Sequence, residues 1–245
     1  MIPVVCPTKG RAGRLLTLNA IKPIILCVAE SEREAYAAAH SGVELLVHPD
    51  SVQGISPKRQ WIYEQVGDVL MVDDDLAALV QTHDLELPSR LTPEHAYDVV
   101  QSVGETARRM GVYLWGLANS HDARYYDANK PLKMSGFIIA CCMGLFKGSR
   151  LAFPDDPYCL YEDYYISGMN AYYYRRIYAD TRWGFQPKNT FHNAGGLSNF
   201  RTTAGEDEGY EALRRLFGNA IVKRVKPSTA GASAHRFQKN LHIPW

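Results

Sequence analysis

The chain has 245 residues, of which 46% are hydrophobic and 22% are charged, as in ordinary soluble globular proteins. This length accommodates one large domain or a domain with an extension. The net charge of +1 identifies no strongly acidic or basic partner, although a local basic face is compatible with it. The longest apolar stretch, FIIACCMGLF, is too short to span a bilayer, and the first residues do not have the charge order of a secretory signal.

The cysteines are the next clue to the class of protein. There are five of them, which is an odd number, and they form no CxxC pair. This arrangement favours reduced, buried thiols over a disulfide framework or a zinc site. We therefore expect a cytoplasmic protein.

Strand and helix alternate through the first third of the chain. The predicted strands are 2–7, 22–29, 43–48 and 68–72, and the predicted helices are 31–42 and 56–66. Alternation at these lengths implies right-handed βαβ units and a largely parallel sheet. Ligands of such sheets bind at the carboxyl ends of the strands.

Capping residues indicate where these helices begin. Ser31 and Glu34 have the spacing of a capping box, and Gly42 is a suitable stop for the same helix. Ser56 is the expected N-cap of the second helix, with Pro57 as its first residue.

The rest of the chain continues the α/β pattern. Thr92 and Pro93 would cap and open a helix at 94–110, and the other predicted elements are strands 112–118 and 136–146 and helices 162–177 and 210–217. The sequence therefore predicts an α/β fold with a mixed, mostly parallel sheet flanked by helices in residues 1–226. Residues 227–245 would form a basic and aromatic C-terminal tail, which is either loosely ordered or wrapped around the body.

Three consecutive aspartates, Asp73, Asp74 and Asp75, follow the predicted strand 68–72. An acidic turn exposed to water is one explanation. Alternatively, carboxylates spaced one residue apart at a strand end can hold a hard divalent cation, with water and substrate phosphates as its other ligands.

Basic residues occur at two places on the same sheet edge, namely the start of the second predicted helix and the loop after the first predicted strand. Lys58 and Arg59 lie near the start of a helix, where the helix dipole disfavours cations unless an anion binds there. Lys9, Arg11 and Arg14 lie in the loop PTKGRAGR, which lacks Walker and GxGxxG spacing. For Lys58 and Arg59, exposed basic side chains are the alternative.

Two further motifs follow in the second half. Glu162 and Asp163 lie at the start of a predicted helix, where they would be either dipole-favoured caps or a general base. His192 precedes a glycine pair in a predicted loop, where it would be either structural or a metal ligand.

The ordered set of these features resembles the GT-A glycosyltransferase superfamily over about residues 2–196, which implies a GT-A type, Rossmann-like fold. The resemblance implies nucleotide-sugar binding by Pro7, Thr8, Arg11, Arg14, Lys58, Arg59, Asp73 and Asp74. It implies that Mn²⁺ or Mg²⁺ is bound by Asp73, Asp75 and His192. As in inverting members, Asp163 would be the catalytic base, with Glu162 beside it.

A narrower resemblance rests on the segments IPVVCPTKGRAGR, KRQWI, MVDDDL and YEDYYI. They look like the TET/JBP-associated glycosyltransferases of bacteriophages and some eukaryotes. This implies transfer of a sugar, with UDP-glucose as the expected donor, to the hydroxymethyl group of a 5-hydroxymethylpyrimidine in DNA. The expected acceptor is 5-hydroxymethylcytosine, and a phage protein would act in the host cytoplasm.

A DNA acceptor requires a basic and partly aromatic surface. The expected phosphate contacts are Arg182, Lys223, Arg224, Lys226 and Arg236. Trp115, Tyr125 and Tyr126 are candidates for stacking on a flipped base. A solvated basic tail is the alternative explanation for the C-terminal cations.

Three other functions remain open from the sequence. The same fold could act on a polysaccharide or protein acceptor, which would not require salt-sensitive DNA binding. A sugar-nucleotide nucleotidyltransferase would share the α/β architecture and the metal, but PTKGRAGR matches its glycine-rich first loop only in part. A non-catalytic nucleic-acid binder is disfavoured by the intact acids at 73, 75 and 163.

Overall fold

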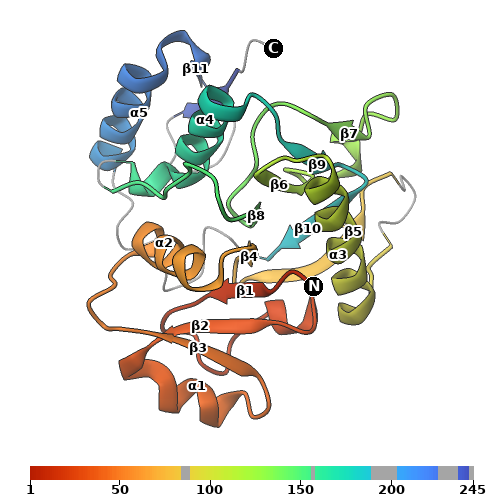
Figure 1. The fold of residues 1–245 in the computed structure, drawn as a ribbon, viewed down its shortest axis with the longest axis vertical. Helices are drawn as coiled ribbons and strands as arrows, with labels where there is room; N and C mark the ends of the chain where they lie inside the picture. Colours follow the sequence, from red (N-terminus) through yellow and green to blue (C-terminus); the bar gives the residue numbers. More distant parts are fainter. Residues whose placement is uncertain (84–88, 156–157, 189–202, 226–236, 243–245) are drawn as a thin grey trace.

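The computed structural model describes residues 1–83, 89–155, 158–188, 203–225 and 237–242 (Figure 1). An eight-stranded sheet with the strand order β3-β2-β1-β4-β8-β6-β9-β7 forms its centre. The strands of this sheet are β1 (Val4–Pro7), β2 (Ile25–Ala29), β3 (Glu44–His48), β4 (Val69–Val72), β6 (Leu114–Leu117), β7 (Leu132–Lys133), β8 (Cys142–Leu145) and β9 (Tyr178–Asp180).

The sheet is mixed but mostly parallel, as predicted. β8 is antiparallel to both β4 and β6, and β7 is antiparallel to β9. The other strands all point in one direction. One edge of the sheet therefore collects the carboxyl ends of β1, β4, β6 and β9, together with the start of β8.

Helices cover both faces of this sheet (Figure 1). The helices are α1 (Arg33–Ala39), α2 (Ile55–Val66), α3 (Pro93–Arg109), α4 (Glu162–Tyr174) and α5 (Thr203–Phe217). Alternate residues of β1 face opposite layers. Val4 and Cys6 pack into the core closed by α1 and α3, whereas Val5 packs into the core closed by α2 and α4.

Two antiparallel pairs lie outside the central sheet. The first joins β5 (Leu76–Gln81) to β10 (Trp183–Pro187), and the second joins β11 (Ile221–Val225) to β12 (Phe237–Leu241). The sequence did not predict these four strands. β12 lies in the segment that was expected to be a tail, and it pairs with β11, the strand before it. The division of the chain into a domain up to residue 226 and a tail from residue 227 stays a prediction.

The predicted cap of the first helix is wrong. The capping box at Ser31 and Glu34 does not form, because α1 begins at Arg33 after a 3₁₀ turn. The Ser31 hydroxyl instead donates a 2.7 Å hydrogen bond to Oδ1 of Asp50, in the loop after β3. A long-range partner has therefore replaced the local one.

The second helix also begins differently from the prediction. α2 starts at Ile55, and Gly54, with φ of 91°, precedes it in place of a side-chain cap. Ser56 is fully buried and its hydroxyl donates to the carbonyl oxygen of Pro154. The start of α2 is thus covered by the chain after β8, which accounts for the burial of Lys58 and Arg59. By contrast, Thr92 caps α3 as expected.

The predicted strand 136–146 forms only over Cys142–Leu145. Residues 137–140 precede it as a loop whose amide groups donate to side chains: that of Ile138 to Ser167 Oγ (3.1 Å), and that of Ile139 to Asn119 Oδ1 (3.2 Å). The apolar character of this run predicted burial correctly, but side chains from other elements replace a neighbouring strand as hydrogen-bond partners.

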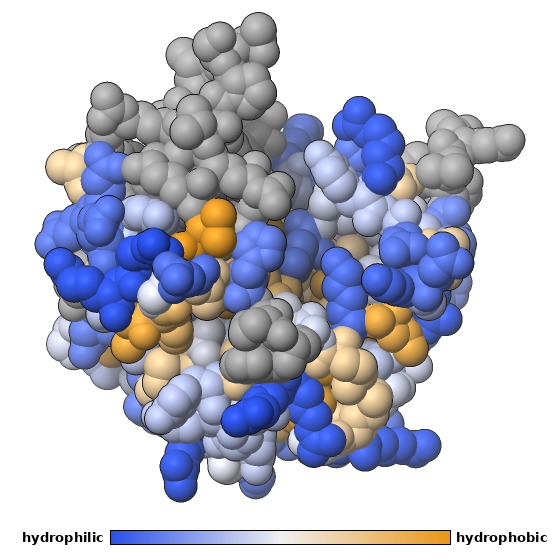
Figure 2. All heavy atoms as spheres, turned by 90° about the horizontal axis from the view of Figure 1, so that it is seen from above, coloured by the Kyte–Doolittle hydropathy of each residue, from blue (hydrophilic) through white to orange (hydrophobic). Residues whose placement is uncertain are grey.

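The surface offers two further observations. None of the helices within the described residues combines the length and the apolar sequence that a membrane span requires. In the view of Figure 2, polar residues cover most of the described surface, and hydrophobic residues form small separate areas between them. Cys6, Cys27 and Cys142 are buried, as expected for cysteines that act as small hydrophobic residues.

Candidate active site

The aspartate triplet lies at the carboxyl edge of the sheet, directly after β4. Its backbone is held by Thr17, whose hydroxyl donates to the Asp73 carbonyl at 2.6 Å and accepts from the Leu76 amide at 3.0 Å. The Asp73 amide donates to the Cys141 carbonyl at 3.2 Å, next to the start of β8. These contacts fix the turn in which the three carboxylates diverge.

Two of the three carboxylates are neutralised by the protein. Asp73 accepts a 2.7 Å hydrogen bond from Arg59 Nη2. Asp74 accepts a 2.8 Å hydrogen bond from the Thr8 hydroxyl and is paired with Arg11. Among the described residues, Asp75 hydrogen-bonds or ion-pairs with no other residue through its side chain. It nevertheless is only 7% exposed.

The environment of Asp75 disfavours its charged form. Burial, followed by repulsion from Asp73 and Asp74, raises the pKa of Asp75 to about 6. Burial also raises the pKa of Asp74, although Arg11 and Thr8 oppose that effect. Within the described residues, the triplet therefore keeps one nearly buried carboxylate that no cation contacts directly, and a bound cation would stabilise its charged form.

The basic residues of α2 point inward, so the alternative of exposed side chains is wrong for them. Lys58 is 5% exposed and Arg59 is 1% exposed. The ammonium group of Lys58 donates to the Thr8 carbonyl at 2.8 Å, and burial lowers its pKa. Both cations therefore bind protein groups around the first loop and the triplet.

Arg59 links the two acidic motifs. Its Nη1 lies 3.6 Å from Glu162 Oε1, while its Nη2 holds Asp73. Nε and Nη1 are buried without a hydrogen-bond partner within the described part of the chain. Burial of a guanidinium at this position requires the acids on both sides of it.

Glu162 and Asp163 begin α4 but lie in different environments. Glu162 is 5% exposed and faces Arg59. Burial raises the pKa of Glu162 to about 7, although Arg59 opposes this shift. Asp163 is half-buried and accepts from the amides of Tyr164 (2.8 Å) and Ala140 (3.4 Å), and burial raises its pKa. Of the two residues, Asp163 is the less buried.

The remaining residues of the first loop have mixed positions. Pro7 ends β1, opposite Cys27 of β2. The Arg11 amide donates to the Tyr36 hydroxyl at 3.0 Å, which ties this loop to α1. Arg14 is exposed and donates to the Gly10 carbonyl of its own loop at 2.9 Å. The structure thus brings Arg11 to the triplet, while Arg14 stays in the loop.

The residues at this edge fit a divalent cation in part. Asp73 and Asp75 offer the oxygen ligands that Mg²⁺ and Mn²⁺ use, and such ions commonly take one or two carboxylates plus substrate phosphates. No group of three or more His, Cys, Asp or Glu side chains within the described residues forms a complete metal site. The predicted third ligand, His192, lies outside the described residues.

The predicted DNA contacts lie far from the triplet in sequence. Arg182 forms hydrogen bonds of 2.9 and 2.6 Å with the two carboxylate oxygens of Asp180. Lys223 and Arg224 lie in β11, whose side chains at these positions are not described, and Lys226 and Arg236 lie outside the described residues.

Of the three aromatic candidates for base stacking, Trp115 is ruled out. Its side chain is fully buried and its ring is stacked on Phe146 in the core, 5.9 Å between centroids. Tyr126 is partly exposed, and Tyr125 is 75% exposed. An accessible planar side chain therefore remains at Tyr125.

Sequence reasoning missed several residues that position the site. Thr17 and Tyr36 hold the triplet and the first loop through their hydroxyl groups. Asn119 accepts from the Ile139 amide and donates to the Phe137 carbonyl at 2.9 Å. Of these, only Asn119 had a signal, because it follows a predicted strand at the carboxyl edge.

Comparison with known protein families gives a match to the first half of the chain. The model of the family described as TET-Associated Glycosyltransferase matches residues 2–119. The matched segment is just under half of the chain and includes Arg11, Lys58, Arg59 and the aspartate triplet. A comparison with curated proteins gives no match. Residues 2–119 are therefore similar to the TET-associated glycosyltransferases, and this match supports a glycosyltransferase.

Proposed function

We propose that the protein transfers a sugar from a nucleotide-sugar, with UDP-glucose as the first candidate, to the hydroxymethyl group of 5-hydroxymethylcytosine in DNA. The family supports the reaction class and a modified-DNA acceptor. The observation that supports the site most directly is the unequal pairing of the triplet. Asp73 and Asp74 have protein cations, whereas the nearly buried Asp75 pairs with none in the part of the chain that the structure describes.

The donor would bind across the ends of β1 and β4. Asp75, assisted by Asp73 and by donor oxygens, would hold Mn²⁺ or Mg²⁺, with His192 as the proposed third protein ligand. When bound, such a cation neutralises charge on the departing diphosphate. Arg11 and Thr8 hold Asp74 beside this position, and Lys58 fixes the loop through the Thr8 carbonyl.

Asp163 is proposed as the general base. It would accept the proton of the acceptor hydroxyl while the oxygen bonds to the anomeric carbon of the sugar. The bond from that carbon to the diphosphate breaks, and its electron pair leaves with the nucleoside diphosphate. Attack from the opposite face converts an α-linked donor into a β-linked product. Glu162 would position Arg59, and through it Asp73, without touching the substrate.

Two measurements on the purified protein test this proposal in order. The first is release of UDP from UDP-glucose with Mn²⁺, with EDTA and in Asp75→Asn. We expect release only with metal and wild-type protein. The second is mass spectrometry of nucleosides from treated 5-hydroxymethylcytosine DNA, where we expect one added hexosyl unit. Metal-dependent UDP release without nucleoside modification would reject the DNA acceptor in favour of a polysaccharide or protein.

A further inference from the structure

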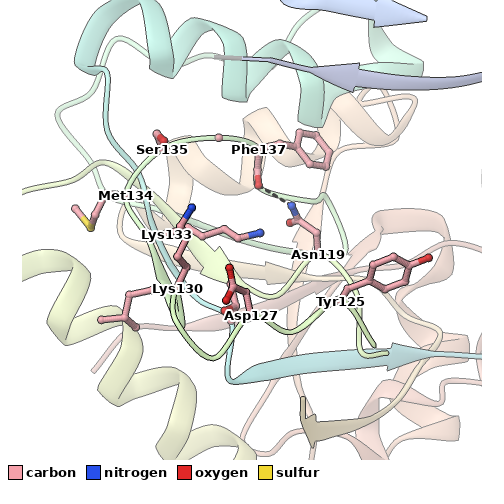
Figure 3. A pocket seen from close by; sticks show the side chains of 11 residues that line it. Asn119, Tyr125, Asp127, Lys130, Lys133, Met134, Ser135 and Phe137 are labelled. Atoms are coloured by element: carbon pink, nitrogen blue, oxygen red, sulfur yellow. Dashed lines mark hydrogen bonds between the residues drawn. The ribbon is translucent and has the colours of Figure 1, made fainter. Parts of the chain in front are cut away.

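A pocket of about 500 Å³ lies at the same sheet edge as the triplet, beyond β8 (Figure 3). It is formed by Asn119, two residues after β6, by β7 with the loops on either side of it, and by Thr181, directly after β9. A second hollow of about 370 Å³ adjoins it and shares Asn119, Tyr125, Lys133 and Thr181 with it. Volumes of this size are those of small-ligand sites.

The pocket and Asp163 are connected by one short loop. Phe137 lines the pocket, and its ring lies 4.6 Å from the ring of Tyr164, the residue after Asp163. Asn119, which also lines the pocket, binds this loop at the Phe137 carbonyl and the Ile139 amide. The next amide of the loop, that of Ala140, donates to Asp163. The loop that lines the pocket therefore also contacts the proposed base and the residue after it.

The loop that carries the pocket lysines is anchored to the sheet. β7 pairs with β9 in antiparallel register, with Lys133 opposite Ala179. The Thr181 amide and hydroxyl each lie 2.8 Å from the Pro131 carbonyl. These contacts fix the backbone between Lys130 and Lys133, so the two cations are held at the pocket in the folded protein.

The chemistry of the lining is basic and aromatic. Within the described residues, neither Lys130 nor Lys133 forms an ion pair. The only acid of the lining, Asp127, accepts from the Asn129 amide at 3.0 Å. Figure 3 shows the lysine side chains between Asn119 and the loop of Met134, with Tyr125 at the side. Unpaired lysines suit phosphates, and an exposed tyrosine suits a planar base.

We infer that this pocket binds the acceptor strand of DNA, with Lys130 and Lys133 on its phosphates and Tyr125 stacked on a base beside Asp163. The inference rests on the proposed function and specifies its acceptor site. A neutral saccharide would leave both lysines without a counter-charge. The target base must leave the duplex to reach this site. Asn119 is a positioning residue, because its amide oxygen and nitrogen are both engaged by the loop.

The inference places the acceptor outside the segment that the family model matches. Residues 2–119 contain the donor side of the edge and end at Asn119. The pocket residues from Tyr125 to Phe137 follow that segment. Donor chemistry and acceptor choice are therefore assigned to successive parts of the chain.

The test is equilibrium binding of a fluorescent duplex that contains 5-hydroxymethylcytosine, measured by anisotropy over a range of salt concentrations. The variant is Lys130→Ala/Lys133→Ala. Its matched control is Lys22→Ala/Lys147→Ala, which removes two exposed lysines located before β2 and after β8, at the opposite edge of the sheet. We expect DNA binding of the pocket variant to weaken at least tenfold. Its slope of log K against log salt should decrease by about 2, because two phosphate contacts are lost.

UDP release without DNA provides the second readout for each variant. We expect the pocket variant to release UDP at the wild-type rate, and Lys130→Arg/Lys133→Arg to restore DNA binding. Equal DNA affinities of the pocket variant and its control would overturn the inference, as would a wild-type protein that binds no DNA. Lysine-dependent DNA binding without sugar transfer would instead uphold the inference and reject the proposed reaction.

Discussion

Arg59, which is 1% exposed, donates a 2.7 Å hydrogen bond to Asp73 from inside the protein. The same guanidinium faces Glu162, so one cation joins the strand end of β4 to the start of α4. Together with the pairing of Arg11 and Asp74, it leaves Asp75 as the acid of the triplet whose side chain has no partner among the described residues. The relationship leads to predictions about stability, pH and turnover.

Arg59→Met should destabilise the protein strongly. It leaves Asp73 and Glu162 without their shared cation, and loss of one partner of a buried ion pair costs about 3–5 kcal/mol. Denaturant unfolding measures the change in free energy. Arg14→Ala is the control, because Arg14 is exposed and its loss should change stability by no more than about 0.5 kcal/mol. Equal effects of the two variants would show that Arg59 is not a structural link.

Asp75→Asn should stabilise the metal-free protein while it abolishes donor turnover. Because the folded pKa of Asp75 is raised to about 6 from 3.8, its ionisation costs the folded state free energy as pH rises through that interval. The asparagine variant avoids this cost, so its advantage should be small near pH 4 and about 1–3 kcal/mol above pH 7. Thermal unfolding in EDTA at both pH values measures the advantage.

The metal supplies the control for that experiment. Mn²⁺ should raise the unfolding temperature of the wild-type protein, because a ligand that binds only the folded state stabilises it. It should leave that of Asp75→Asn nearly unchanged. An asparagine variant that is less stable than wild type at pH 7 in EDTA would contradict the account of Asp75 as an uncompensated carboxylate.

Asp163→Asn should separate donor binding from transfer. The amide keeps the size of the side chain but cannot accept the hydroxyl proton, so transfer should fall by about 10²–10⁴. Donor affinity, measured by calorimetry with UDP-glucose and Mn²⁺, should be unchanged. Transfer at the wild-type rate would remove Asp163 as the base.

Tyr125→Ala should weaken the acceptor interaction without affecting UDP release. Loss of one base-stacking contact costs about 1–3 kcal/mol, which corresponds to an increase in KM for DNA of about 5- to 150-fold. Tyr125→Phe retains the ring and should behave as wild type. A phenylalanine variant as impaired as the alanine variant would point to the hydroxyl group instead of stacking.

Local sequence predicted the parallel half of the sheet because each of its strands is a short apolar run with a clear stop. The same reasoning placed the aspartates at a carboxyl edge, since that position follows from strand direction alone. It failed where a partner lies far along the chain. β5 and β10 pair residues about a hundred positions apart. The hydroxyl groups of Ser31 and Ser56 do not cap their own helices and instead donate hydrogen bonds to Asp50 and Pro154.

In the candidate site too, local sequence identified the residues but not their distant partners. The residue types at 73–75 and 162–163 were evident as candidates, but their pairing was not. Burial of Lys58 and Arg59 depends on the chain after β8 covering the start of α2, which no local pattern records. The pocket of Lys130 and Lys133 was missed because two separate loops form it, and neither contains a recognisable motif.

The central claim is sugar transfer to modified DNA, and mass spectrometry of nucleosides tests it most directly. DNA containing 5-hydroxymethylcytosine would be incubated with Mn²⁺, UDP-glucose and either the wild-type protein or Asp163→Asn. We predict one hexosyl unit on 5-hydroxymethylcytosine with the wild-type protein and almost none with the variant. Unmodified nucleosides with a wild-type protein that releases UDP in the same tube would contradict the claim.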